Sequence, residues 1–323
     1  MALNSSDKNK LNKKPKSVLM FLEIPSTKFL IVEGDGDEKF YSNYISSEEV
    51  YPVDKTKEYI KGDPDYKEEK LNAKSFVQFL VDKHLKTVKE NPAITYGKCF
   101  GIIDNDFDGI DSERYPNLGK NLITTDARDL ETTLLKYDYN HLKDFFSEDF
   151  NTDNSGIDIL EKAINNASQI GKLRKLREDQ RKTLHGKLTK DISINFKAKE
   201  PDDIGYLPFV TENLDFAFDS YVGIQYSKEQ ISKLKNPLKI YTKPSLFYCR
   251  GHDIFDFIAC FYKKQNKLRP AHTSKGSSIL KIRGIFEDLL REKFNDAEFK
   301  SSSPMYQFIV SNFPENFTRS PLE

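Results

Sequence analysis

The sequence predicts an α/β protein in which a parallel-sheet domain is followed by a mainly helical C-terminal domain. Short apolar segments alternate with helical segments over residues 20–140, and acidic residues follow several of the apolar segments directly. Beyond residue 140 the apolar residues recur with helical spacing. The predicted organisation is therefore a disordered basic lead over residues 1–19, the sheet domain over 20–140 and the helical domain over 141–323.

Four short apolar runs are predicted to be strands, at residues 28–32, 50–53, 99–103 and 122–124. Runs of this kind are typical of parallel strands that are buried on both faces. Helices are predicted from about Asp37 to Tyr44, over residues 73–88 and from about Asp129 onward. Strands that alternate with helices at these lengths indicate a sheet covered by helices on both faces.

The second half of the chain is predicted to contain five helices separated by proline-containing loops. Their predicted ranges are 157–167, 173–188, 228–234, 254–262 and 279–294. No internal repeat is visible, so the segment is predicted to be an irregular helical domain with an aromatic-rich core.

Composition narrows the function classes. The 323 residues include 37% hydrophobic residues, and no apolar run is long enough to span a membrane, which predicts a cytoplasmic protein with no membrane partner. Cys99, Cys249 and Cys260 are too few and too far apart for a disulfide framework and are predicted to be reduced.

The chain carries 50 basic and 50 acidic residues, so any nucleic-acid surface must be local. Residues 172–199 are strongly basic and contain the candidate nucleic-acid contacts Lys172, Arg174, Lys175 and Arg181. The alternative is a solvated helix face with no ligand.

Acidic residues follow three of the predicted strands. Glu33, Asp104 and Asp126 each stand just beyond a strand end, where the ligands of parallel α/β sheets collect. Carboxylates gathered there repel one another unless a cation lies between them, and oxygen ligands suit Mg²⁺ or Mn²⁺. Asp106 follows Asp104 at a spacing that lets both carboxylates face one ion in an extended backbone. Asp37, Asp126 and Asp129 are equally compatible with helix or loop capping.

A second motif lies in the helical half. Arg250, Gly251, His252 and Asp253 precede the helix predicted over 254–262. Asp253 or His252 can serve as its cap. Alternatively, a helix N-terminus that carries arginine and histidine binds phosphate through backbone N–H groups and cationic side chains.

Two segments carry a family resemblance. KFLIVEGDGD, at residues 28–37, resembles the first Toprim motif, and GIIDNDFDG, at residues 101–109, resembles the second. The later TDARDLE at 125–131 and RGHD at 250–253 are similar to Toprim-like effectors of the OLD and PARIS type, most closely the AriB-like nuclease subunit of the PARIS phage-defence system. The resemblance implies a Toprim, Rossmann-like catalytic domain over residues 20–140.

The resemblance also implies a function. A Mg²⁺- or Mn²⁺-dependent endonuclease is expected, with Glu33 and His252 as catalytic candidates. The candidate metal ligands are Glu33, Asp104 and Asp106, followed by Asp37, Asp108 and Glu131; Arg250 is a further nucleic-acid contact. The implied role is that of a toxic defence effector that cleaves RNA such as tRNA, with DNA as the alternative, controlled by an ABC-type ATPase and acting as a dimer. Rival hypotheses are a non-catalytic module that binds a metal or a partner, and a nucleotidyl transferase or primase-like enzyme.

Overall fold

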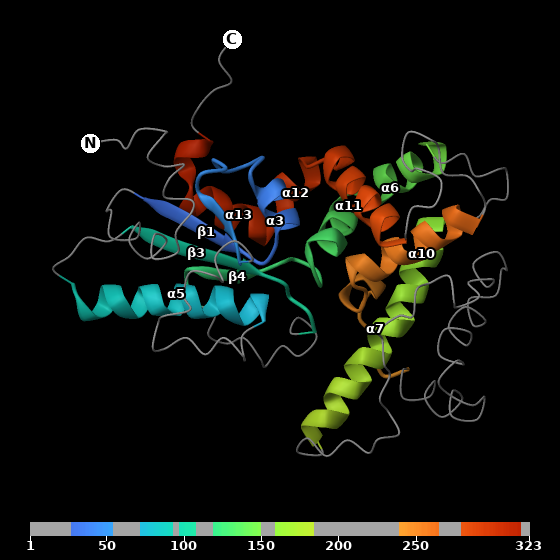
Figure 1. The fold of residues 1–323 in the computed structure, drawn as a ribbon, viewed down its shortest axis with the longest axis horizontal. Coiled ribbons are helices and arrows are strands. Elements are labelled where there is room, and N and C mark those ends of the chain that lie inside the picture. The colour runs from blue at the N-terminus through green and yellow to red at the C-terminus, as the bar shows by residue number, and fades with distance from the viewer. Residues whose placement is uncertain are drawn as a thin grey trace, which may run out of the picture. The chain divides into compact units, whose positions relative to one another are not determined.

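The computed structural model describes residues 27–53, 72–92, 97–107, 119–149, 159–183, 239–264 and 279–317. The chain forms two compact units. We call Met1–Asp104, Tyr115–Asp126 and Ser302–Glu323 the sheet unit, and Asn105–Arg114 with Ala127–Ser301 the helical unit. Figure 1 shows the elements of both.

The sheet unit is built on four parallel strands, which are β1 (Lys28–Val32), β2 (Val50–Pro52), β3 (Lys98–Ile103) and β4 (Leu122–Thr124). Their order is β2-β1-β3-β4. The register pairs Leu30 with Val50 and Phe100, so β1 lies between β2 and β3. The predicted parallel α/β class is confirmed, and the four predicted strands are present to within one residue at each end.

One face of the sheet packs against helix α5 (Ala73–Glu90), whose N-cap Asn72 accepts the N–H of Ser75 at 2.8 Å. The core on this side includes Phe29, Ile31, Cys99, Phe76 and Val77. Gly101 lies at the closest approach, because a Cβ there would stand 2.6 Å from Leu122 and 2.7 Å from Val77. The periodic apolar residues of 73–88 thus bury one helix face, as the sequence predicts.

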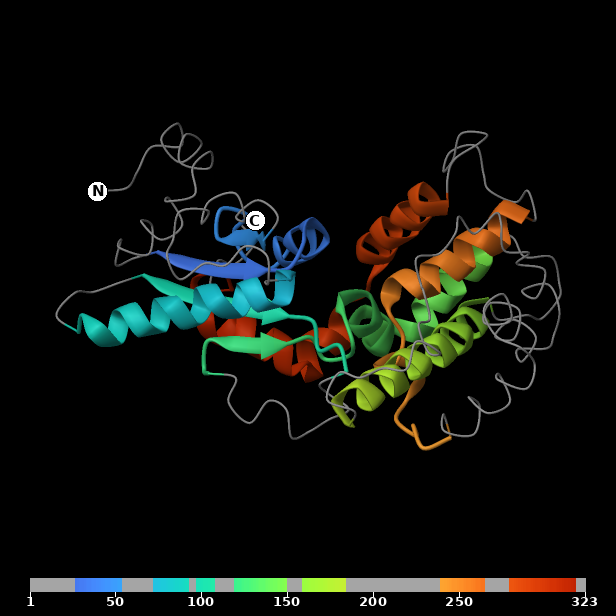
Figure 2. The ribbon, with the colours of Figure 1, turned by 60° about the horizontal axis from the view of Figure 1, so that its bottom comes forward.

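The opposite face packs against the end of the chain. Successive strand residues point to opposite faces, so Phe100 is directed away from α5 and makes edge contacts with the rings of Phe308 and Phe313. Phe308 belongs to helix α13 (Pro304–Asn312), and the short helix η6 (Pro314–Asn316) follows. Figures 1 and 2 show α5 and α13 on opposite sides of the strands. Helix α3 (Asp35–Tyr41) joins this side through the Tyr41 hydroxyl, which lies 3.2 Å from the Met305 sulfur.

Among the described residues of the helical unit, the regular elements are all helices. These are α6 (Leu130–Asp149), α7 (Ile159–Thr183), η5 (Ser245–Phe247), α10 (Gly251–Lys264) and α11 (Ile279–Lys293), with most of α12 (Ala297–Ser302). Helix α10 packs against both α7 and α11. Phe146, Phe255 and Phe286 meet in the core between α6, α10 and α11.

Several helix boundaries differ from the sequence predictions. The helices predicted at 157–167 and 173–188 are one continuous helix, α7. Gly171, which favours a break, is required inside it because a Cβ there would stand 1.8 Å from the carbonyl oxygen of Tyr248. Helix α10 begins at Gly251, three residues earlier than predicted, and α3 begins at Asp35 instead of Asp37.

Some predictions concern residues outside the described ranges. These are the basic lead at 1–19, the helix at 228–234, the basic residues beyond 183 and Asp108; the side chains of Cys260 and Arg181 also lie outside. No helix in the described part of the chain is both long and apolar enough to cross a membrane.

Candidate functional site

Two acidic residues come together at the carboxyl edge of the sheet. Glu33 follows β1, Asp104 follows the adjacent strand β3, and the backbone N–H of Asp104 donates to Glu33 Oε1 at 2.8 Å. After β1 the chain proceeds to β2 on one side, whereas after β3 it proceeds to β4 on the other. The pair therefore flanks the point at which the strand order reverses, which is the position where open parallel sheets bind their ligands.

Two further hydrogen bonds hold the backbone at this edge of the sheet. Asp37 Oδ2 accepts the N–H of Gly34, the N-cap of α3, at 2.9 Å, so Asp37 acts as a capping residue of α3. Lys74, only 9% exposed, donates from Nζ to the carbonyl oxygen of Asp104 at 2.6 Å. A buried ammonium on α5 thus anchors the residue that follows β3.

Asp106 stands in a different backbone conformation from Asp104. Its φ is 50°, in the left-handed region that aspartate tolerates better than most residues. Its N–H donates to the carbonyl oxygen of Arg128 at 2.8 Å. The extended strand ends before Asp106. The expectation that Asp104 and Asp106 point the same way, as residues two apart in a strand do, therefore does not apply to Asp106.

Asp126, the acid that follows β4, is engaged structurally. Its carboxylate accepts the hydroxyl of Ser303, and the N–H of Met305 donates to it at 3.3 Å. Ser303 is the N-cap of α13, so Asp126 reinforces that cap and ties α13 to the end of β4. This matches the capping alternative.

The donor set at the strand ends fits a magnesium ion. Mg²⁺ is bound through one or two protein carboxylates and keeps water for its other positions. Glu33 and Asp104 are two acidic residues at adjacent strand ends, and both are half-buried. In the part of the chain that the structure describes, no three His, Cys, Asp or Glu side chains form a group arranged to hold a metal.

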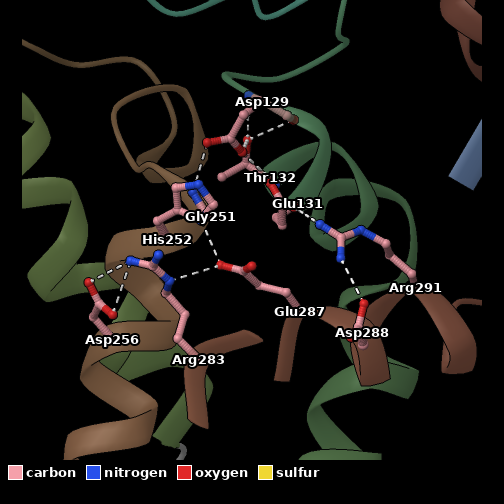
Figure 3. Close-up of polar contacts among 10 residues, drawn as sticks. All are labelled: Asp129, Glu131, Thr132, Gly251, His252, Asp256, Arg283, Glu287, Asp288 and Arg291. Atoms are coloured by element: carbon pink, nitrogen blue, oxygen red, sulfur yellow. Dashed lines mark hydrogen bonds and ion pairs between the residues drawn. The ribbon is translucent and has the colours of Figure 1, made fainter. Parts of the chain in front are cut away.

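In the helical unit, one carboxylate caps two helices. Asp129 Oδ1 accepts the N–H of Thr132 in the first turn of α6 at 3.0 Å, and Asp129 Oδ2 accepts the N–H of Gly251, the first residue of α10, at 2.8 Å. Figure 3 shows both bonds. The residue that caps α10 is therefore Asp129, and not His252 or Asp253, which the sequence offers as its cap.

Glu131 lies beside this double cap. Its carboxylate is paired with the guanidinium of Arg291 on α11 (Figure 3). Burial raises the pKa of Glu131, and Arg291 opposes that effect. A Cβ on Gly251 would stand 2.3 Å from the Glu131 Cβ, so glycine is needed where α10 meets α6. Glu131, a candidate metal ligand by resemblance, is here an ion-pair partner within the helical unit.

His252 forms a pair with a glutamate of α11. Its Nδ1 lies 2.6 Å from Glu287 Oε1, and the imidazole is 55% exposed whereas the Glu287 side chain is 10% exposed. The bond to Glu287 raises the pKa of His252 to about 9, with burial acting in the opposite direction. The imidazole is thus a cation at neutral pH.

Glu287 has a second cationic neighbour. Arg283 Nε lies 3.4 Å from Glu287 Oε1, and Arg283 Nη1 lies 3.4 Å from Asp256 Oδ2 (Figure 3). Burial raises the pKa of Asp256 to about 6, although Arg283 opposes the shift. The four side chains form one charged network between α10 and α11.

The structure separates the basic candidates from one another. Lys175 is 2% exposed and pairs with Asp179 inside the unit, and Arg174 makes a two-pronged pair with Asp253. Lys172 Nζ lies 5.3 Å from the centre of the Tyr248 ring. Arg250 is exposed, immediately before α10. Basic residues that lie close together in the sequence therefore have different environments in the fold.

Glu287 and Arg128 are among the residues that the sequence analysis did not identify. Glu287 lies 35 residues beyond His252, and no local pattern connects them. Arg128 is 2% exposed, donates to the carbonyl oxygen of Tyr248 and stacks 3.9 Å from the centre of the Phe107 ring. Burial and the neighbouring Arg250 lower the pKa of Arg128 to about 10, so it stays charged at neutral pH. Charged residues are rarely buried, and a sequence gives no signal for such a case.

Comparisons with models of protein families, with curated proteins and with solved structures found no match to this chain.

Proposed function

We propose that this chain is a Mg²⁺-dependent nuclease of the Toprim class that hydrolyses phosphodiester bonds. The observation that carries the proposal is the placement of Glu33 and Asp104 at the switch point of the parallel sheet, where the backbone N–H of Asp104 donates to Glu33 Oε1 at 2.8 Å. Acidic residues at this position suit a cation that faces phosphate. The motif resemblance of residues 28–37 and 101–109 supports the same class.

In this proposal Glu33 and Asp104 hold the ion, with Asp106 as the next candidate ligand. Mg²⁺ bound there would polarise a phosphate oxygen and lower the pKa of a water molecule. The N–H of Asp104 holds one oxygen of Glu33, and the carboxylate still has lone pairs with which to accept a proton. Water adds to phosphorus, Glu33 takes its proton, and the bond from phosphorus to the leaving oxygen breaks.

Lys74 has a positioning role in this scheme. Its ammonium bonds to the Asp104 carbonyl at 2.6 Å and so fixes the backbone that carries a ligand. A charged donor at this point also offsets the repulsion between neighbouring carboxylates.

The substrate and partners follow from the sequence resemblance alone. We propose RNA such as tRNA as the substrate, with DNA as the alternative, and action in the cytoplasm. We also propose control by an ABC-type ATPase of a phage-defence complex, in which the chain acts as a dimer.

Cleavage assays test the proposal. Purified protein is incubated with labelled tRNA and with supercoiled plasmid, in Mg²⁺ and in EDTA. Cleavage is expected only with the metal, and it should fall by at least about a hundredfold in Glu33→Gln, because loss of a catalytic carboxylate removes a proton acceptor. The matched control is Asp82→Asn, which neutralises an exposed acid on α5 in the same unit.

Metal binding gives a second readout that does not depend on turnover. Mn²⁺ affinity, followed by electron paramagnetic resonance, should weaken by about tenfold or more in Asp104→Asn, because a charged oxygen ligand is lost. Wild-type protein that binds neither Mn²⁺ nor Mg²⁺ would overturn the proposal. Protein that binds metal but cuts neither nucleic acid would be a binding module, and incorporation of labelled nucleotides would identify a nucleotidyl transferase.

A further inference from the structure

Within the described residues, the buried guanidinium of Arg128 has a carbonyl, and not a carboxylate, as its hydrogen-bond partner. The side chain is 2% exposed, and Nη1 donates to the carbonyl oxygen of Tyr248. Its Nε is also buried and makes no hydrogen bond in the part of the chain that the structure describes. Buried charges are normally paired, and an unpaired one is unfavourable. An apolar side chain of similar volume would avoid this cost, so packing alone does not explain an arginine here.

Other arginines of the helical unit have acidic partners. Arg291 pairs with Glu131, and Arg174 makes two hydrogen bonds to Asp253. Arg128 differs from both, because the groups that its side chain contacts are a carbonyl and an aromatic ring.

Two contacts of Arg128 hold the segment that follows β3. Its carbonyl oxygen accepts the N–H of Asp106 at 2.8 Å. Its Cζ lies 3.9 Å from the centre of the Phe107 ring, in a cation–π contact, and Phe107 is itself buried. Arg128 thus contacts two consecutive residues, the first through its main chain and the second through its side chain.

Asp106 is the residue that these contacts constrain. Its φ of 50° is unfavourable for a residue with a Cβ, and such a conformation persists where the surrounding structure enforces it. Burial lowers the pKa of Arg128, whereas the carboxylates of Asp129 and Asp106 raise it. The Asp106 carboxylate therefore lies within electrostatic reach of the guanidinium that holds its segment.

Arg128 is anchored in turn by the core of the helical unit. The Tyr248 carbonyl that accepts its Nη1–H lies against Gly171 of α7, where a Cβ would stand 1.8 Å from the oxygen. The next residue, Asp129, caps both α6 and α10. The contacts of Arg128 therefore connect residues 106 and 107 to the packed helices of the unit.

We infer that Arg128 is the positioning residue of Asp106. Held by the Tyr248 carbonyl and packed on Phe107, its guanidinium keeps the Asp106 backbone in one conformation and so sets the direction of the carboxylate. That this carboxylate binds Mg²⁺ rests on the proposed function, in which Asp106 is the next candidate ligand. A ligand that is already oriented binds more tightly, because less conformational freedom is lost on binding.

Amide exchange in EDTA tests the positioning without any metal. Arg128→Met keeps most of the side-chain volume but removes the donors and the charge. Exchange at residues 106 and 107, measured relative to that of core amides in α7, should accelerate about tenfold, as expected for the loss of one charge-assisted hydrogen bond. Phe107→Leu removes the ring and leaves Arg128 in place, so the amide of Asp106 should exchange faster in this variant too, even if Arg128→Met does not fold.

Arg291→Met is the matched control. It removes an arginine of the same unit whose ion pairs are with Glu131 and Asp288. The substitution should lower the stability of the unit, because it leaves the buried Glu131 without its partner, and it should leave the relative exchange at residues 106 and 107 unchanged.

Mn²⁺ affinity, followed by electron paramagnetic resonance, tests whether Arg128 acts through Asp106. Arg128→Met should weaken the affinity about tenfold, as for other residues that orient metal ligands. Asp106→Gly removes the carboxylate and accommodates the positive φ, and in this background Arg128→Met should have no further effect. A merely structural loss would weaken binding equally in both backgrounds, and Arg291→Met should bind as the wild type does.

Each outcome decides the inference. Unchanged exchange at residue 106 in both Arg128→Met and Phe107→Leu would overturn it, as would an equal loss of Mn²⁺ affinity with and without the Asp106 carboxylate. If Asp106→Gly binds Mn²⁺ normally while Asp104→Asn binds it weakly, the inference fails and the nuclease proposal stands. If the wild type binds no metal but exchange at residue 106 responds to both variants, the nuclease proposal fails and Arg128 still positions Asp106.

Discussion

Replacing Asp129 by alanine removes a carboxylate that caps two helices at once. Loss of the cap on Thr132 is expected to cost about 1 kcal/mol, as for other N-caps. Loss of the bond from the Gly251 N–H to a charged acceptor costs about 1.5 kcal/mol more. The free energy of unfolding of the helical unit should therefore fall by about 2.5 kcal/mol in Asp129→Ala, on the sum of these two terms.

An asparagine at this position separates the two contributions. It keeps one acceptor oxygen and replaces the other by an NH₂ donor, so it can cap one helix only. Asp129→Asn should lose about 1.5 kcal/mol, between wild type and Asp129→Ala. Asn72→Ala is the control, because Asn72 caps the single helix α5 and its loss should cost about 1 kcal/mol.

Urea titrations followed by circular dichroism measure these free energies. Amide hydrogen exchange provides the local readout, and it should accelerate in the first turns of both α6 and α10 in Asp129→Ala. A loss no larger than that of Asn72→Ala, or faster exchange in one helix alone, would refute the double-cap argument.

Three further predictions concern individual positions. Asp106→Ala should be less stable than Asp106→Gly by about 1 kcal/mol, measured by urea titration, because φ at this residue is 50° and alanine has a Cβ; equal stabilities would contradict it. Lys74→Met removes the donor to the Asp104 carbonyl, so amide exchange at residues 104–106 should accelerate about tenfold while β3 is unchanged, and uniform acceleration would indicate a general packing defect instead. Burial raises the pKa of Asp256 from 3.8 to about 6, so its contribution to stability is present below pH 4 and is lost as the pH rises through 6. Asp256→Asn should accordingly gain stability relative to wild type between pH 4.5 and pH 7.5 in urea titrations, and a difference that does not change with pH would refute this assignment.

The strands could be predicted because their signal is local. Lys28–Val32 and Leu122–Thr124 are short apolar runs, and burial on both faces of a parallel sheet requires such runs. The helix that covers one face, Ala73–Glu90, was equally visible from the period of its apolar residues.

Helix boundaries were less predictable because tertiary contacts set them. Separate helices are predicted at 157–167 and 173–188, yet α7 runs unbroken through Gly171, where a Cβ would stand 1.8 Å from the carbonyl oxygen of Tyr248. Similarly, α10 begins at Gly251 because Asp129, which is 122 residues earlier in the chain, supplies the acceptor for its N–H. A single sequence contains no sign of either contact.

By itself, the sequence determined the α/β class, the parallel strands and the placement of Glu33 and Asp104 at strand ends, since each depends on residues that are neighbours along the chain. Only the tertiary structure decided which strands are adjacent, and hence that these two acids flank the switch point. It also decided that His252 is anchored by Glu287. The physical reason is that hydrogen bonds and ion pairs join groups that are close in space, and the folding of the chain alone determines which groups those are.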